Sequence, residues 1–224
     1  MGCAIVSAQP AAATAAAPAT SPAPSPAPSP ATVPADQSTP KAALKTFSRA
    51  LETGDASRVR ELLSAEGEHE RELAEATVTL AEASAQLARA ASSAFGDERA
   101  RPLGVDPHAT EEAIERIDAA TEKIDGESAT LRIADSDDPA IVLVRRNGKW
   151  RVPVAELMKN VEAADVQRNV ADMIWQAKQM RELSEEVSTG KYATAAEARQ
   201  ALDRRIMERS LPPLRSTTAP TTRK

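Results

Sequence analysis

The first 40 residues set the strongest limit on what this chain can fold into. They hold nine of the 16 prolines and a single charged residue, Asp36. A segment so poor in large apolar side chains cannot bury enough surface to offset the entropy of ordering its backbone. The repeated Ser-Pro-Ala-Pro of residues 21–30 favours extended polyproline-type conformations instead. We therefore predict a disordered tether over residues 1–37, one domain over residues 38–209 and a disordered tail over residues 210–224.

The start of the chain has some features of an export signal. Residues 4–8 are small and apolar, and Val6-Ser7-Ala8 resembles the end of a secretory signal. The basic start and the apolar stretch of about 7–15 residues that complete such a signal are missing. Three interpretations stay open: a signal peptide that begins before Met1, a lipoprotein signal that ends at Gly2-Cys3, and a plain disordered terminus. We expect an exported protein of the periplasm or cell envelope of a bacterium, with the cytoplasm as the alternative.

Composition narrows the kind of partner. The formal net charge is -5, from 28 basic and 33 acidic residues, and only 2% of the residues are aromatic. Nucleic-acid binding needs concentrated Lys and Arg and aromatic stacking surfaces, so we expect no nucleic-acid partner. The single cysteine, Cys3, excludes a disulfide within the chain. No apolar run reaches the roughly 18–20 residues of a bilayer span, so we expect no membrane span, with a lipid anchor as an open alternative.

The first foldable segment carries clear helix signals. Thr39 and Pro40 suit the start of a helix that ends at Gly54, and Asp55 can cap a short second helix. Apolar side chains recur on one face of each helix: Leu44, Phe47 and Leu51 in the first, and Val59, Leu62 and Leu63 in the second.

Two longer helices show a seven-residue apolar repeat. The first is predicted over residues 68–94 and carries Leu73, Ala76, Leu80, Ala83, Leu87, Ala90 and Ala94. The second carries Val166, Val170, Met173, Ala177, Met180, Ser184 and Val187. Small side chains in the first repeat complement larger ones in the second, which favours pairing within one chain. We predict an antiparallel pair and a monomer, with a homodimer through the leucines of the first repeat as the alternative.

The strands lie between these two helices. Residues 129–133 alternate in polarity, and residues 141–144 form an apolar strand core. Asn147-Gly148 is typical of a two-residue hairpin turn leading into residues 149–152. These signals predict a helix-dominated α+β fold, with a small curved antiparallel sheet packed on helices.

Further helices are predicted beyond the hairpin. Pro153 ends the strand pairing and begins a helix through Met158. A last helix starts at Thr194, where Thr194-Ala-Ala-Glu197 fits a capping box. Its predicted buried side chains are Ala198, Ala201, Leu202 and Ile206.

Some of these segments resemble a known superfamily. Residues 40–63, Ile124-Asp125-Gly126 and residues 144–152 resemble parts of the nuclear-transport-factor-like, or SnoaL-like, α+β cone. The resemblance implies a curved sheet packed on helices around a conical pocket. Catalytic members are similar in using acidic and histidine or tyrosine residues in the cone, and no position here matches them. The long helix from Glu68 and the helices after Val152 depart from the pattern, so the resemblance implies a fold and no activity.

The densest basic cluster lies on the predicted hairpin. It contains the five candidate binding residues, Arg145, Arg146, Lys149, Trp150 and Arg151. The cluster could hold an anionic group of a small molecule or protein partner. The alternative is a solvated hairpin end, in which Arg145 covers Trp150 by a cation–π contact and Trp150 belongs to the core. The turn also places Arg146 opposite Lys149, where like charges repel.

A metal-like pattern stands at the start of the long helix. Glu66, His69, Glu72 and Glu75 are spaced three apart, as in one half of a di-iron site. The second half is missing, since the only other histidine is His108. We interpret the pattern as a charged, solvated helix face, and we predict no metal and no cofactor.

No sequence motif indicates catalysis. The chain has no Gly-x-Ser-x-Gly, no Gly-rich phosphate loop and no dinucleotide fingerprint, so we name no catalytic residue. The leading hypothesis is an exported or envelope-tethered, non-enzymatic binding or assembly domain. The alternative is a small-molecule pocket enzyme or ligand-binding protein of the SnoaL-like kind.

Overall fold

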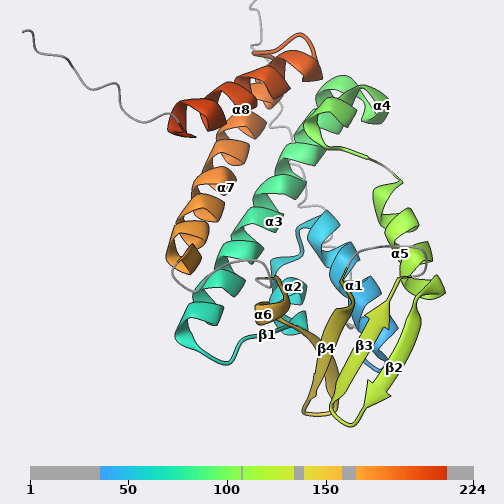
Figure 1. Ribbon diagram of the computed structural model, residues 1–224. Helices are drawn as coiled ribbons and strands as arrows, with labels where there is room; N and C mark the ends of the chain where they lie inside the picture. Colours follow the sequence, from blue (N-terminus) through green and yellow to red (C-terminus); the bar gives the residue numbers. More distant parts are fainter. Residues whose placement is uncertain (1–35, 107, 134–138, 158–164, 211–224) are drawn as a thin grey trace, which may run out of the picture. The chain divides into compact units, whose positions relative to one another are not determined.

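A computed structural model describes residues 36–106, 108–133, 139–157 and 165–210 of the protein (Figure 1). The domain is a helix-dominated α+β fold, as predicted, and it contains a five-stranded sheet. The elements are α1 (Pro40–Thr53), α2 (Ala56–Leu62), β1 (Leu63–Ser64), α3 (Glu68–Phe95), α4 (Asp97–Ala100), the 3-10 helix η1 (Arg101–Leu103), α5 (Ala109–Ala119), β2 (Thr121–Asp125), β3 (Ser128–Arg132), β4 (Ile141–Arg146), β5 (Lys149–Pro153), α6 (Val154–Leu157), α7 (Val166–Ser188) and α8 (Ala195–Ser210). Met158, the predicted end of the helix after the hairpin, lies outside the described residues.

The first helix begins and ends where the sequence predicts, and the second begins after its predicted cap, but Leu63, predicted to lie in the second helix, belongs to β1. Thr39 Oγ1 accepts a hydrogen bond from the amide of Ala42, and Asp55 caps α2 through the amide of Arg58. Gly54 ends α1 in the left-handed region, at φ 67°. A Cβ atom at Gly54 would lie 2.7 Å from Cβ of Ala85 in α3, so the chain there needs glycine both for its conformation and for its close approach.

The last residue that the sequence analysis assigns to the tether, Gln37, contacts the domain. Gln37 is buried, and its carbonyl oxygen accepts a hydrogen bond from the amide of Trp150 in β5 at 3.1 Å. Its side-chain amide donates to the carbonyl oxygen of Glu61 in α2 at 3.2 Å. Gln37, placed by the sequence analysis at the end of the tether, therefore packs with the domain.

The sheet is mixed rather than purely antiparallel. Its strand order is β1-β5-β4-β3-β2, and the four longer strands pair antiparallel. The short strand β1 pairs parallel with β5, with Leu63 beside Val152. The prediction missed β1, because a two-residue strand carries no alternation pattern. The hairpin register is as predicted, with Arg145 opposite Trp150.

One face of the sheet forms the main core with the first helices. Leu131, Leu143 and Trp150 on this inner face are at most 3% exposed. They belong to one cluster with Phe47 of α1 and Leu62 of α2. Apolar side chains fill the space between the sheet and these helices.

The helices α3 and α7 lie side by side within one chain, but they run parallel (Figure 1). Near their starts Gln167 contacts Glu72, and near their ends Ser184 contacts Gln86. The residue number rises along both helices together, so the predicted antiparallel direction is wrong. The helices are parallel because of the path of the chain between them. After α3 ends, the chain returns through α5 and the sheet to the end of the domain where α3 begins, and α7 starts there (Figure 1).

Burial follows the predicted apolar repeat only in part. Of the seven positions predicted in α3, four are buried: Leu73, Ala76, Ala83 and Leu87. Leu80 is half-buried and Ala94 is exposed, so no continuous heptad seam is observed. The helix buries a second face as well, where Ala81 and Ala85 lie against the end of α1. A helix covered on two sides does not show the single stripe of a coiled coil.

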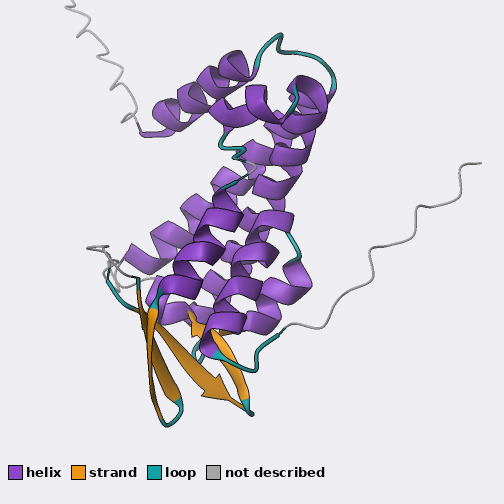
Figure 2. Ribbon diagram, turned by 90° about the vertical axis from the view of Figure 1, so that its right-hand side faces the viewer, coloured by secondary structure: helices purple, strands orange, loops and turns teal. Residues whose placement is uncertain are grey.

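Helix α8 folds back over the ends of α3 and α7 (Figures 1 and 2). Ala198 and Leu202 pack with Leu87 and Leu183 in a second core cluster. Thr194 Oγ1 accepts from the amide of Glu197, as the capping box predicts. Two predicted burials fail: Ile206 is 39% exposed and Ala201 is half-buried.

Hydrogen bonds connect α8 and the loop before it to Glu186 of α7. The Glu186 carboxylate accepts hydrogen bonds from Lys191, Tyr192 and Arg205 at 2.6–2.7 Å. Partial burial raises the pKa of Glu186, but these three hydrogen bonds outweigh it and lower the pKa to about 2.

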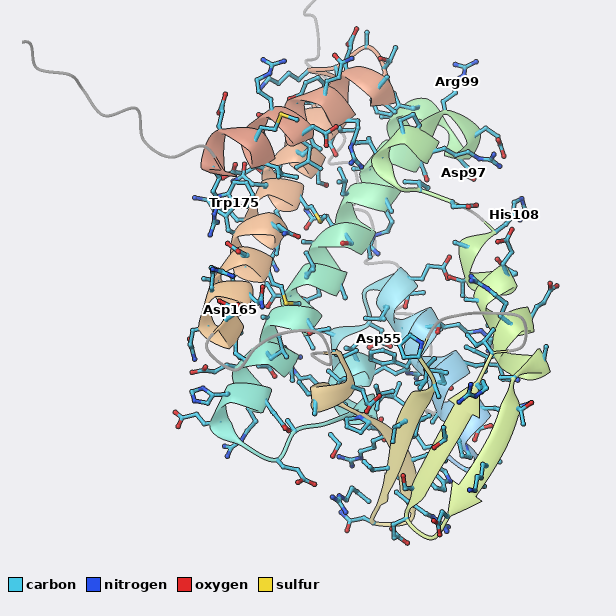
Figure 3. The ribbon with its side chains drawn as sticks, in the orientation of Figure 1. Asp55, Asp97, Arg99, His108, Asp165 and Trp175 are labelled. Carbon is cyan, nitrogen blue, oxygen red and sulfur yellow. The ribbon has the colours of Figure 1, made fainter. Side chains whose placement is uncertain are left out.

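Trp175 contacts the neighbouring helix α8. The Arg209 guanidinium lies 4.6 Å from the centre of the Trp175 ring, at the end of α8 (Figure 3). Arg209 also forms an ion pair with Asp172 at 2.5 Å.

No helix in the described part of the chain combines the length and the apolar character needed to span a bilayer.

Candidate functional site

The predicted basic hairpin forms as β4 and β5, and its cations divide between the two faces of the sheet. Arg146 pairs directly with Lys149, and Arg151 pairs with Val144 on the same face. This is the outer face, opposite the buried side chains. Because Lys149 and Arg151 are two residues apart on one strand, the three basic side chains are neighbours. We call Arg146, Lys149 and Arg151 the outer-face cations.

The other two candidate residues lie on the inner face. Trp150 is 3% exposed and belongs to the main core. The Arg145 guanidinium lies 5.9 Å from the centre of the Trp150 ring, and its Nε donates to the carbonyl oxygen of Gly148 at 3.4 Å. The cation–π contact between Arg145 and Trp150 is therefore present as predicted. The structure thus brings three of the five candidate binding residues together on the outer face.

Two of the outer-face cations have acidic partners from the segment before α3. Lys149 Nζ lies 3.0 Å from a carboxylate oxygen of Glu61, and Arg146 forms an ion pair with Glu66. The sequence analysis did not predict these partners, which are 88 and 80 residues away along the chain. The acids relieve the repulsion that Arg146 and Lys149 would otherwise feel across the strand pair. All four side chains are 42–68% exposed, so solvent screens both ion pairs.

Arg151 differs from its two neighbours. Within the described part of the chain it forms no ion pair, and its Nε atom is buried without a hydrogen-bond partner. The side chain as a whole is half-buried. A guanidinium held in this way lacks part of the hydrogen bonding it would have in water.

The rest of the outer face is half-buried or exposed and carries charges of both signs, since the exposed Asp125 lies on it beside further basic residues. Thr130, Val142 and Val144 are half-buried between the cations. Lys123 and Arg132 lie on the same face farther from the turn, and both are exposed. The face therefore offers small apolar side chains between positive charges.

A separate groove lies between α1, α3 and the segment around η1. It has a volume of about 880 Å³, and Leu51, Ala85, Ala88 and Val105 supply its apolar side chains. Polar side chains that line it include Glu52, Arg89, Asp97 and Asp106. Arg89 donates to the carbonyl oxygen of Thr53 at 3.0 Å, so part of this polar lining is engaged within the protein.

The four residues of the metal-like pattern contact other side chains and do not converge on one point. Glu66 pairs with Arg146, and Glu75 accepts a bidentate hydrogen bond from Arg60 at 2.9 and 3.0 Å. His69 and Glu72 both contact Gln167 of α7. Among the described residues, no group of three or more metal-ligating side chains forms. His108 stands at the start of α5 and points away from the helices (Figure 3).

Comparison with protein-family models, with curated proteins and with solved structures found no match in any of the three.

Proposed function

We propose that this protein is a non-enzymatic binding domain that recognises an anionic group of its partner through the outer-face cations. The observation that carries the proposal is Arg151, a half-buried arginine that has no acidic partner among the described residues and lies beside two further cations. Arginine offers a planar fork of donors that suits a carboxylate or a phosphate. The two paired neighbours add positive charge on the same face.

The packing on the inner face of the sheet favours binding at the outer face over binding in a pocket beneath the sheet. A pocket of the SnoaL-like kind would lie between the curved sheet and the helices. Leu131, Leu143 and Trp150 fill that space with apolar side chains instead. The alternative, a small-molecule pocket enzyme or ligand-binding protein, would then use the groove beside Leu51 and Ala88.

The location in the cell forms part of the proposal. The signal-like start and the Pro/Ala-rich segment favour an exported or envelope-tethered protein, with the cytoplasm as the alternative. Of the first described residues, Asp36 contacts Thr46 of α1, and Gln37 bonds β5, which carries Lys149 and Arg151. A tether would therefore leave the domain beside the strand that carries the proposed site.

Titration of the whole protein with citrate and with pyrophosphate tests the binding proposal. Two-dimensional NMR should show that the amide signals of β4 and β5 shift together, more strongly at about 20 mM than at about 150 mM salt. Arg151→Gln should remove most of this response. Arg168→Gln removes an arginine of α7 whose side chain is 70% exposed and pairs with Asp165, and it should leave the response intact. Equal responses in the two variants would contradict the proposal.

A further inference from the structure

We propose that Glu61 and Glu66 are built-in competitors for the outer-face cations, and that the partner is an acidic peptide segment that displaces them. This inference rests on the function proposed above, because it names the partner of the same site. It concerns what already occupies Lys149 and Arg146 in the free protein.

The two acids come from one short stretch of chain beside the hairpin. Glu61 lies in the last turn of α2, and Glu66 precedes α3. Between them, Leu63 and Ser64 form β1, which runs parallel to β5. Two carboxylates five residues apart on this stretch therefore reach two cations that face each other across β4 and β5. A peptide that carries several carboxylates can copy the same arrangement.

The ion pairs of these acids are easily exchanged. Glu66 is 68% exposed and Glu61 is 42% exposed at the side chain. Exposed ion pairs stabilise a protein little, so each can lower the affinity for a competing anion by about fivefold at most. Arg151 has no such competitor in the described part of the chain and can form the first contact with the incoming segment. Binding would then proceed from Arg151 to Lys149 and Arg146.

The chemistry favours a peptide over a nucleic acid. The positive charge is a compact patch, and the formal net charge of the chain is -5, which repels a long polyanion. Within that patch the internal ligands are carboxylates. Arg146 and Arg151 can each receive a carboxylate in a bidentate manner.

The test is calorimetric titration of the whole protein with a hexaglutamate peptide at about 50 mM salt. The double variant Glu61→Gln, Glu66→Gln keeps the shape of both side chains and removes both competitors. It should bind hexaglutamate about three- to tenfold more tightly than the parent. The matched control is Glu111→Gln, Glu115→Gln on α5, which changes the net charge equally and should gain less than twofold.

Each outcome decides between the two proposals. If the double variant binds hexaglutamate more tightly than the parent and Arg151→Gln loses binding, both proposals are supported. Equal affinity in the parent and the double variant overturns the competitor role and leaves the binding site standing. No binding in the parent or the double variant overturns both. Tighter binding of a twelve-nucleotide DNA than of hexaglutamate overturns the peptide as the partner.

Discussion

The hydroxyl of Ser184 in α7 donates a hydrogen bond to the carbonyl oxygen of Gln86 in α3 at 3.3 Å. Ser184 is 3% exposed, so this bond lies within the interface of the two helices. The bond determines which turn of α7 lies beside which turn of α3. Nearer the middle of the pair, Ala83 and Ala177 are both fully buried. Such small side chains let the two backbones approach closely.

The close approach predicts that a larger side chain at Ala177 is not tolerated. Ala177→Leu should lower the free energy of unfolding by about 1–3 kcal/mol, because the added atoms overpack the interface. Ala171→Leu on the exposed side of the same helix should change it by less than about 0.5 kcal/mol. Urea unfolding followed by circular dichroism measures both. Equal stability of the two variants would show that the helices do not meet at Ala177.

The half-burial of Leu80 predicts an uneven response along the helix pair. Leu183 is fully buried, so Leu183→Ala should lower the free energy of unfolding by about 2–4 kcal/mol. Leu80→Ala should cost only about 1 kcal/mol, because part of the side chain already contacts water. Thermal unfolding of the two variants compares these sites directly. A larger loss at Leu80 than at Leu183 would reverse this ranking.

Gly54 predicts a measurable effect of steric crowding. Gly54→Ala adds left-handed strain of about 1 kcal/mol and a contact with Ala85 that forces α1 and α3 apart, so we expect a loss of about 2–3 kcal/mol. Gly126 has a similar φ of 59° and no atom within 4 Å of the added Cβ. Gly126→Ala therefore isolates the strain, and should cost about 1 kcal/mol. Chemical denaturation should show that difference, and equal losses would argue against the crowding.

Glu186 predicts a pH-dependent contribution to stability. Its pKa of about 2 in the folded protein lies below the ordinary value of 4.5. The carboxylate therefore stabilises the fold fully above about pH 4.5, and this contribution is lost as the pH falls toward 2. Glu186→Gln should cost about 1–2 kcal/mol at pH 7 and little at pH 2.

The neighbouring acid provides the control for Glu186. Glu185 is exposed, and Glu185→Gln should change stability little at either pH. Guanidinium unfolding at pH 7 and pH 2 separates the two variants. A cost for Glu186→Gln that is the same at both pH values would contradict the charged role of this carboxylate.

Features set by neighbouring residues were predictable from the sequence. Asn147 and Gly148 adopt positive φ values of 53° and 76°, the conformation of a tight hairpin turn. The turn fixes the register, so the pairing of Arg146 with Lys149 could be derived before the structure was known. The caps Thr39 and Asp55 were equally local signals.

Features set by distant residues were not predictable. The direction of α7 depends on α5, which the apolar pattern did not indicate because Ile117 is its only buried residue. The partners of Arg146 and Lys149 depend on β1, which lies beside β5 and is too short to produce a pattern. Sequence analysis therefore identified the cations of the candidate site but missed Glu61 and Glu66. It also missed β2, where four of the five residues are exposed.

The bond between the Trp150 amide and the carbonyl oxygen of Gln37 has a mechanical consequence. A pulling force applied along the N-terminal segment acts first on Asp36, whose carbonyl oxygen accepts a hydrogen bond from Thr46 Oγ1 of α1 at 3.3 Å, and then on the buried Gln37. From Gln37 the load passes into β5, which is paired with β4 on one side and with β1 on the other. Traction on a tether would thus reach the strand that carries Lys149 and Arg151 as directly as it reaches α1.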